Sequence, residues 1–549
     1  MNVTAESGYD YIIVGAGSAG CVMANRLSED EGVTVLLLEA GGSDRNLFIH
    51  MPAGVQRVHR KSELNWNYLT DREPQMDHRQ LKVPRGKVLG GSSSINAMVY
   101  MRGHPTDYDR WASEFGLAEW DFAHCLPYFK KAERSERGES EYHGASGPLG
   151  VSRSHYRSVL FDAFLRAGET SGVGTSDDLN GYKPEGLALY DSTKWNGKRC
   201  SAAVAYLHPV RHRTNLTVLT GALAHRVDVA NGRAVGVTFE RSSKISSVRA
   251  NREVILCGGA INSPHLLMLS GIGPADELRR AGIQPIIDLP GVGKNLQEHI
   301  DIAMEWDCTK PVTIAHLGNP AVQLAAGARW LLTGGGPAAS NIFEVGGLVR
   351  SNSSVDYPNI QYHFIPAAYE LKGEKISLRQ GFQIQINQAR QQSRGELTLR
   401  SSDPRQPISI RFDMLATEHD RREVVEAFAL TRHIVAQRAF DAYRGKESVE
   451  TAQCRTPDQI LAYVRRTAGT EYHPSCTCRM GNDAMAVVDE ALAVRDIEGL
   501  RVIDASVMPN ILSANLNAPT IMIAEKAADI VRRRSALPAH RPGFHFDAR

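Results

Sequence analysis

The feature that most constrains this chain is a glycine-rich turn that follows an apolar run near the N-terminus. Residues 9–14 form the apolar run and lead directly into Gly15-x-Gly17-x-x-Gly20. The first glycine permits a tight turn, the second lets the backbone approach a pyrophosphate, and the third lets a helix pack closely on the strand. Ser18 lies in the same turn, at the start of a helix whose N-terminus would carry the phosphate charge. The pattern predicts a nucleotide-binding unit.

A carboxylate that closes the next strand indicates which nucleotide the unit binds. Residues 35–38 form a second apolar run, which ends at Glu39. A carboxylate at this position accepts hydrogen bonds from the ribose hydroxyls and repels a 2′-phosphate, so an NADP-type ligand is disfavoured. The chain holds one G-x-G-x-x-G motif, which agrees with a single bound dinucleotide.

The bulk composition excludes several classes of function. The chain has 549 residues, of which 42% are apolar and 23% charged, with a net charge of +2. The length suits two or three domains, and nothing in the charge balance indicates a nucleic-acid partner. Eight cysteines without framework spacing are typical of reduced thiols in the cytoplasm. Neither a secretory signal nor a membrane-spanning run is predicted, while peripheral contact with the inner face of a membrane stays open.

A second loop is rich in small and polar residues. Residues 90–94 read Gly-Gly-Ser-Ser-Ser, and Asn96 follows them. The backbone amides of Gly91 and Ser92, together with the Asn96 side chain, could face a phosphate or a flavin ring. A surface turn is the alternative. The apolar residues 97–100 follow at once and imply burial, which favours the ligand-binding interpretation.

Strand patterns predict an α/β fold in which one domain is built from separate parts of the chain. Strands are expected at 216–219 and 234–239, and buried strands at 253–257 and 500–504, with helices at 420–437 and 520–534. Residues 359–365, 382–387 and 395–400 alternate between apolar and polar side chains, which predicts an antiparallel sheet with one wetted face. We predict a discontinuous Rossmann-type domain from residues 1–155, 200–310 and 470–535, and a substrate domain with an antiparallel sheet and helices from residues 156–199 and 311–469.

The segment 472–481 holds the clearest candidate for chemistry. Histidine titrates near neutral pH, so His473 could take the proton from a substrate hydroxyl. A purely structural histidine is the alternative. Cys476 and Cys478 lie close in sequence to this histidine, but a zinc site usually needs a fourth ligand and more regular spacing, so no metal is predicted. Asn517, at the start of the final helix, could donate a hydrogen bond to a substrate oxygen or cap the helix.

Taken together, these motifs resemble the glucose-methanol-choline (GMC) oxidoreductases. Members of this family combine the N-terminal glycine-rich turn with a loop that matches residues 90–96. They also carry a Gly-Ala-Ile-Asn-Ser-Pro segment that matches residues 259–264, and a His-Pro pair that matches His473. All four motifs occur here in the family's order, and the resemblance covers nearly the whole chain.

The resemblance implies an FAD-dependent oxidation in which His473 takes the proton of an alcohol, Asn517 assists it, and hydride passes to the flavin. Some relatives attach FAD covalently through a histidine in the loop at 90–96. The matching residue here is Ile95, so non-covalent FAD is expected. By the same resemblance, three further residues lie beside the adenine, the pyrophosphate or the flavin: Val227, Asp504 and Thr520.

The resemblance also favours a small primary alcohol, choline-like, as the substrate. Glu344 matches a position where choline-oxidising members place a carboxylate, and Trp66 and Tyr472 are aromatic neighbours suited to a quaternary cation. A structural ion pair is the alternative role of Glu344. Three other functions stay open: an oxidase that makes hydrogen peroxide, a dehydrogenase of a neutral alcohol or hydroxy acid, and a lyase with a structural FAD. The electron acceptor, whether a quinone, a dye or oxygen, is not predicted.

Overall fold

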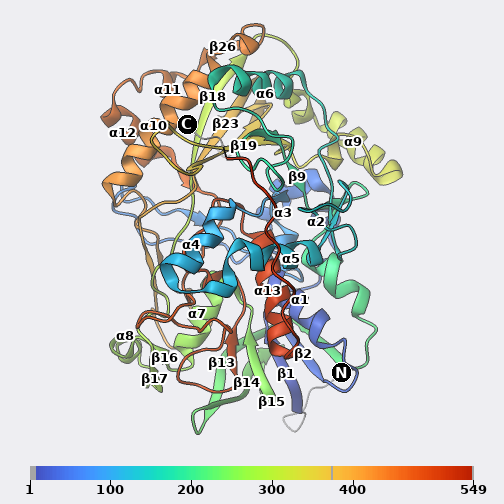
Figure 1. The fold of residues 1–549 in the computed structure, drawn as a ribbon, viewed down its shortest axis with the longest axis vertical. Coiled ribbons are helices and arrows are strands. Elements are labelled where there is room, and N and C mark those ends of the chain that lie inside the picture. Colours follow the sequence, from blue (N-terminus) through green and yellow to red (C-terminus); the bar gives the residue numbers. More distant parts are fainter. Residues whose placement is uncertain (1–7, 373–374, 547–549) are drawn as a thin grey trace.

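Two sheets organise the computed structural model, which describes residues 8–372 and 375–546 (Figure 1). The first sheet, with β1, β2 and β15, lies in the lower half of Figure 1, and the second, with β18, β19 and β23, lies in the upper half. The prediction about a signal at the N-terminus falls on residues 1–7, outside the described residues. Within the described ranges, no helix combines the length and the apolar character needed to cross a membrane.

The first sheet begins with the predicted nucleotide unit. Its strand order is β12-β2-β1-β15-β14-β13, and β28 lies beside β15. The pairs among β12, β2, β1, β15 and β28 are parallel, whereas β13 and β14 form an antiparallel edge. The bounds are β1 (Gly8–Val14), β2 (Val35–Glu39), β12 (Leu216–Thr220), β13 (Ala222–Ala230), β14 (Arg233–Arg241), β15 (Lys244–Leu256) and β28 (Leu500–Val502).

The last helix of the chain packs against the first. Helix α13 (Asn517–Val531) contacts both α1 (Ser18–Leu27) and α5 (Phe122–Ala132). Arg26 of α1 donates two hydrogen bonds to Glu525 of α13, at 2.9 Å from Nε and 2.6 Å from Nη2. The Glu525 side chain is fully buried, and a bidentate arginine–carboxylate pair fixes both distance and orientation. The C-terminal segment is therefore tied into the domain that the N-terminus begins.

The second sheet is antiparallel, with the strand order β26-β18-β23-β20-β19-β8 and β27 beside β18. Helix α10 (Glu418–Val435) packs against β23 and against α6 (Val159–Ser171) and α12 (Pro457–Thr467), and α6 also contacts β8. The bounds of the strands are β8 (Gly186–Leu189), β18 (Ile300–Cys308), β19 (Val345–Val349), β20 (Ile360–Ile365), β23 (Gly381–Gln388), β26 (Arg444–Glu447) and β27 (Gly469–Thr470).

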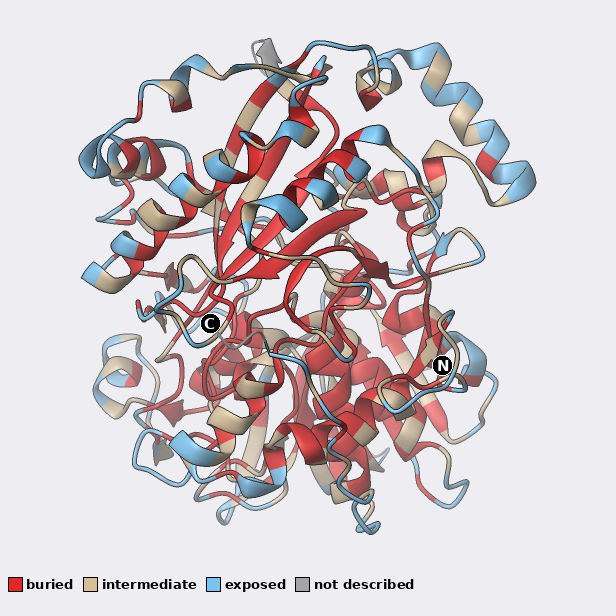
Figure 2. Cartoon of the chain, turned by 45° about the horizontal axis from the view of Figure 1, so that its top comes forward, coloured by how far each residue is buried: buried red, intermediate tan, exposed pale blue. Residues whose placement is uncertain are grey.

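The prediction that one face of this sheet is exposed to bulk solvent is wrong. Every residue of β20 is buried, and β23 is buried along almost its whole length. Figure 2 shows these strands in the colour of buried residues, beneath helices whose outer sides are exposed. The apolar residues of the alternating pattern pack in the core, and polar residues such as His363 and Gln385 line an internal cavity instead of bulk solvent.

The third alternating segment does not join this sheet. Residues Glu396–Thr398 form β24, which pairs with β25 (Ser409–Arg411) as a separate two-stranded sheet. Gly395 and Leu296 exchange backbone hydrogen bonds of 2.8 and 3.0 Å, so the start of this segment pairs with residues that precede β18. The helices predicted at 420–437 and 520–534 are observed as α10 and α13, each beginning and ending a few residues earlier.

The predicted fold class, a discontinuous Rossmann-type domain plus a domain with an antiparallel sheet, is confirmed by the two sheets and by the return of β28 to the first. β18 pairs in the second sheet, although residues 200–310 are assigned above to the first domain, and the domain boundaries stay a prediction. The other helices are α2 (Leu47–His50), α3 (Val55–His59), α4 (Pro105–Phe115), α7 (Gly259–Leu269), α8 (Ala275–Arg280), α9 (Pro320–Thr333) and α11 (Val449–Ala452).

Short strands form the remaining two-stranded sheets. The pairs are β3 (Tyr68–Leu69) with β4 (Lys82–Val83), β5 (Val99–Tyr100) with β9 (Asp191–Ser192), β6 (Glu133–Ser135) with β7 (Leu149–Val151), β10 (Lys194–Trp195) with β11 (Lys198–Arg199), β16 (Ile272–Gly273) with β17 (Ile287–Asp288), and β21 (Ala368–Lys372) with β22 (Lys375–Arg379).

The contact between α1 and β1 gives a first prediction. A Cβ atom on Gly20 would lie 1.8 Å from the carbonyl oxygen of Gly15, so Gly20→Ala forces the helix away from the strand. We expect a loss of at least about 2 kcal/mol of stability, measured as a fall of several degrees in the apparent melting temperature. Gly42→Ala is the matched control, because a Cβ there meets no atom within 4 Å. Equal melting temperatures for the two variants would contradict the close packing.

Candidate active site

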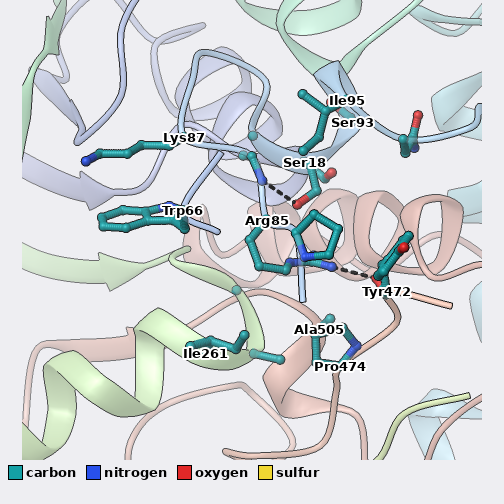
Figure 3. Close-up of a pocket in the computed structure, with 18 of the residues that line it drawn as sticks. Ser18, Trp66, Arg85, Lys87, Ser93, Ile95, Ile261, Tyr472, Pro474 and Ala505 are labelled. Carbon is teal, nitrogen blue, oxygen red and sulfur yellow. Dashed lines mark hydrogen bonds between the residues drawn. The ribbon is translucent and has the colours of Figure 1, made fainter. Parts of the chain in front are cut away.

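A cavity of about 570 Å³ lies where the two domains meet, within the range of about 300–1,000 Å³ that small ligands occupy. Its walls come from the glycine-rich turn, the loop at 84–98, the start of α7, the second sheet, and the segments around His473 and Asn517. Figure 3 shows part of this wall, with Ser18, Ser93 and Ile95 from the two glycine-rich loops near one another and Ile261 of α7 on the far side.

Two glycine-rich loops meet backbone to backbone at one end of the cavity. The Gly90 amide donates to the Ala16 carbonyl at 2.7 Å, and a Cβ on Gly91 would lie 2.7 Å from Gly17 Cα. A Cβ on Gly17 itself would meet nothing closer than the Cys257 carbonyl at 3.9 Å. The Gly17 backbone is therefore open to the cavity, and a side chain there would fill the space. This cradle fits the pyrophosphate of a dinucleotide.

Glu39 lines the cavity beside this cradle. Its carboxylate accepts hydrogen bonds from the Ala16 amide at 2.8 Å and the Gly41 amide at 2.7 Å. Burial raises the pKa of Glu39 to about 7, while the two amide hydrogen bonds oppose that shift. The side chain is therefore held at the end of β2, where the ribose of a dinucleotide would lie in a Rossmann-type domain.

The other residues predicted to bind the cofactor line the cavity, with two exceptions. Gly20 lies in α1 and packs against the Gly15 carbonyl, away from the cavity lining. Val227 does not line the cavity either: its amide donates to Ser270 Oγ at 2.8 Å, and its side chain is buried. Residues 222–224 of the same strand line the cavity in its place. Asp504 accepts hydrogen bonds of 2.8 Å from the Gly259 and Ser506 amides, and so fixes the start of α7. The lining residues from the prediction are Gly15, Gly17, Ser18, Glu39, Gly91, Ser92, Asn96, Asp504 and Thr520.

A chain of hydrogen bonds sets the tautomer of His473. His299 Nε2 lies 3.2 Å from the Ala389 carbonyl, which can only accept, so this nitrogen carries the proton. His299 Nδ1 is then an acceptor and lies 3.0 Å from His473 Nδ1, which must donate. His473 Nε2 therefore carries no proton and is an acceptor. The His473 amide also donates to Glu298 Oε1 at 2.7 Å, which anchors the backbone.

The electrostatics keep His473 neutral. Burial lowers its pKa well below the usual value, and the positive charges that His299, His363 and Arg85 would contribute lower it further. Burial also lowers the pKa of His299 to about 4. Both imidazoles are therefore neutral at neutral pH, and His473 Nε2 can accept a proton.

The amide beside His473 belongs to Asn515, not to Asn517. Asn515 Nδ2 lies 3.3 Å from His473 Nε2, and Asn515 Oδ1 accepts from Gln361 Nε2 at 3.0 Å. The bond from Gln361 fixes the amide so that its N–H points at the histidine. Asn517 also lines the cavity, but its Oδ1 accepts a 2.7 Å hydrogen bond from Ser18 Oγ. The sequence analysis missed Asn515, which lies two residues before Asn517, just outside the start of α13.

The three residues predicted to hold a cation do not gather at one place. Trp66 lines the cavity with Lys87 Nζ 4.5 Å from its ring. In Figure 3 this pair lies on one side and Tyr472 on the other, with Arg85 between them donating to the Tyr472 carbonyl. Glu344 is buried, is not among the lining residues, and lies 3.3 Å from Lys194 Nζ. Glu344 therefore has a cationic partner within the protein.

A pair of carboxyl groups that the sequence analysis missed lines the cavity near His473. Asp301 and Glu471 share a hydrogen bond, and Asn387 Nδ2 donates to Glu471 Oε1 at 2.7 Å. Burial raises the pKa of both, and the charge of Glu471 raises the pKa of Asp301 further. The pair therefore holds a proton between two carboxyl groups. The signal in the sequence is Glu471 itself, which precedes the Tyr472–His473 pair.

Comparisons with known proteins agree with this architecture. A sequence family described as GMC oxidoreductase matches residues 9–301 and 391–524. The chain is 48% identical over 548 residues to an oxygen-dependent choline dehydrogenase of Xanthomonas axonopodis pv. citri (strain 306), with 98% of both chains covered. It is 46% identical over 543 residues to an oxygen-dependent choline dehydrogenase of Pseudomonas savastanoi pv. phaseolicola (strain 1448A / Race 6), covering 98% of this chain and 95% of the relative.

Solved structures give the same answer for the fold. Pyridoxine 4-oxidase from Mesorbium loti superposes with a TM-score of 0.87 at 30% identity, over 96% of this chain and 100% of that one. Formate oxidase from Aspergillus oryzae RIB40, in a structure that concerns modification of its FAD, superposes with a TM-score of 0.90 at 26% identity, over 97% of this chain and 99% of that one.

Proposed function

This chain belongs to the GMC oxidoreductase family of FAD-dependent enzymes, and we propose that it oxidises a small primary alcohol carrying a cationic group, choline-like, to the aldehyde. The cofactor and the reaction class are inferred from the family membership. The observation that carries the catalytic assignment is the hydrogen-bond chain that leaves His473 Nε2 unprotonated at the cavity. When bound, FAD supplies the acceptor for the two electrons that leave the alcohol carbon as a hydride.

His473 is the proton acceptor in this proposal. Its Nε2 lone pair takes the proton of the alcohol hydroxyl, while Nδ1–H stays bonded to His299. The Asn515 amide, oriented by Gln361, donates to the alcohol oxygen and stabilises the negative charge that develops as the proton leaves. The cradle at Gly17 and Gly91, with Glu39 beside it, is proposed to hold the dinucleotide. Asn517 is proposed to tie the glycine-rich turn to α13 through Ser18.

Replacing the two asparagines separates their roles. We expect Asn515→Ala to lower kcat/KM by about 100-fold, because a donor aimed at the developing alkoxide is lost. Asn517→Ala, two residues along the chain, is the control, and we expect a fall of less than about tenfold with weaker FAD retention. The measurement is the rate of flavin reduction after anaerobic mixing with alcohol. A large loss with Asn517→Ala and none with Asn515→Ala would restore the assignment made from the sequence.

The cationic end of the substrate is proposed to lie against Asp301 and Glu471. These carboxyl groups line the cavity, whereas Glu344 is neutralised by Lys194. A quaternary ammonium group has no hydrogen to donate, so it needs nearby negative charge and apolar or aromatic contact. Tyr472, next to Glu471, lines the same wall. The Lys194–Glu344 pair favours one rival, a neutral alcohol as the true substrate, because it removes the carboxylate on which relatives are expected to rely.

Anaerobic flavin reduction by choline and by its neutral isostere, 3,3-dimethylbutan-1-ol, tests the function and the site together. We expect choline to have the lower KM, and Glu471→Gln to raise the KM for choline by about tenfold while leaving that for the isostere nearly unchanged, since a tenfold change corresponds to about 1.4 kcal/mol. As pH rises through the raised pKa of the pair, its negative charge grows, so the KM for choline falls and that for the isostere does not.

Glu344→Gln is the matched control, and we expect it to leave both KM values within about twofold. A rise in the KM for choline with this variant alone would move the cation to Glu344. Reduction by neutral alcohols but not by choline would establish the rival substrate class, and absence of reduction by any alcohol would favour a lyase.

FAD is proposed to be bound without a covalent link. Ile95, which lines the cavity at the position of the linking histidine in some relatives, has no nucleophilic atom. His59, which also lines the cavity, is engaged at Nε2 by the Ile95 carbonyl at 2.8 Å. Acid precipitation of the purified protein is expected to leave the yellow colour in the supernatant. A yellow pellet would contradict the proposal.

A further inference from the structure

Helix α9 carries its apolar face outward. Three of its leucines are strongly exposed, Leu324 at 77%, Leu331 at 62% and Leu332 at 86%. At 100° per residue, the exposed apolar residues fall within an arc of about 120°. A globular protein normally turns such a face toward its core. The arc consists of Ala321, Leu324, Ala325, Ala328, Leu331 and Leu332, all of which are exposed.

The inner side of the helix is already packed. Trp330 is buried and donates to the Gly197 carbonyl at 2.7 Å, and Gln323 accepts from Arg57 at 3.0 Å. The helix also contacts the turns on either side of it, at 314–318 and 337–339. Figure 1 shows α9 at the edge of the molecule, and Figure 2 shows most of its surface coloured as exposed. The outward face is therefore not explained by packing within the chain.

The charged residues of the segment that contains α9 are all basic. Residues 308–343 contain no aspartate or glutamate, and their charged residues are Lys310 and Arg329. Arg57 and Arg60, at and just beyond α3, are exposed beside the helix to which Arg57 is bonded. An apolar arc flanked by arginines and free of acidic residues is the pattern of a helix that lies in the interface of an anionic bilayer.

We propose that α9 docks the protein on an anionic lipid surface, with the exposed leucines in the interface and the neighbouring basic residues against the headgroups. A second copy of the chain fits less well, because a two-fold contact along this face would bring the same arginines together, whereas an anionic surface neutralises them. The proposal does not depend on the substrate or on the proton acceptor assigned above.

The position of α9 determines which end of the cavity would face the lipid surface. Arg57 links α9 to α3, and Val55, Gln56 and His59 of α3 line the cavity. A protein seated on α9 therefore holds this end of the cavity near the lipid surface. An electron acceptor or an alcohol dissolved in the bilayer would then have a short path to the site.

Vesicle flotation of the FAD-loaded protein tests the proposal. The vesicles are phosphatidylcholine alone, or phosphatidylcholine with about 30% phosphatidylglycerol. We expect the wild-type protein to float with the anionic vesicles, to float less at high salt, and to remain at the bottom with the neutral ones. Combining Leu324→Gln, Leu331→Gln and Leu332→Gln is expected to lower the partition coefficient by at least about tenfold, because these residues supply most of the apolar contact.

The control pairs Ile245→Gln with Val449→Gln, two apolar residues that are 59% and 70% exposed elsewhere on the surface. This variant is expected to float like the wild type, and both variants are expected to reduce FAD with alcohol as the wild type does. Failure of the wild type to float, or equal flotation of the leucine variant, would overturn the proposal. A wild-type dimer in solution that the leucine substitutions dissociate, without vesicle binding, would assign the face to a second copy instead.

Discussion

The close approach of two backbones, at Gly17 and Gly91, is the constraint on which the rest of the structure depends. The turn after β1 and the loop at 90–94 touch with no side chain between them, and α1 rests on Gly15 at the same point. Because no side chain intervenes, main-chain amides form the end of the cavity, and an anionic group can be bound by dipoles that are fixed by the fold. The first sheet, α1 and the loop must all be in register for this surface to exist.

The reactive end of the cavity has the opposite character, since it is built from side chains that the second sheet orders. His299, which directly precedes β18, is hydrogen-bonded to His473 itself. Gln361 of β20 orients Asn515, the other partner of His473. The imidazole itself comes from a segment near the C-terminus. A proton acceptor with a defined tautomer therefore requires the two domains to meet, and neither domain holds the complete group.

Much of the fold could be predicted from local patterns. The glycine spacing, the apolar runs and Glu39 were sufficient to predict the nucleotide-binding unit, because each of these positions has one steric or electrostatic requirement.

The side chains in the site were harder to assign. Asn515 and Asn517 lie two residues apart and have the same side chain, and only the three-dimensional path of the chain shows which amide reaches His473. Lys194, which neutralises Glu344, is 150 residues away in sequence. Asp301 meets Glu471 because β18 pairs with β27, placing Asp301 opposite Gly469. The prediction that one face of the second sheet is exposed to solvent was wrong because the other domain covers that face. An alternating pattern of apolar and polar residues cannot reveal such a covering domain.

The return of β28 and α13 to the first sheet has a consequence for synthesis on the ribosome. The nascent chain makes the nucleotide turn within its first residues, yet Asp504, Asn517 and the buried partner of Arg26 emerge only after residue 500. Until then α1 lacks the helix that covers it, and its apolar side is without its native partner. The first domain can close only when the polypeptide is almost finished, so translation time, more than the intrinsic speed of any helix or strand, sets the earliest moment at which the cofactor can be captured.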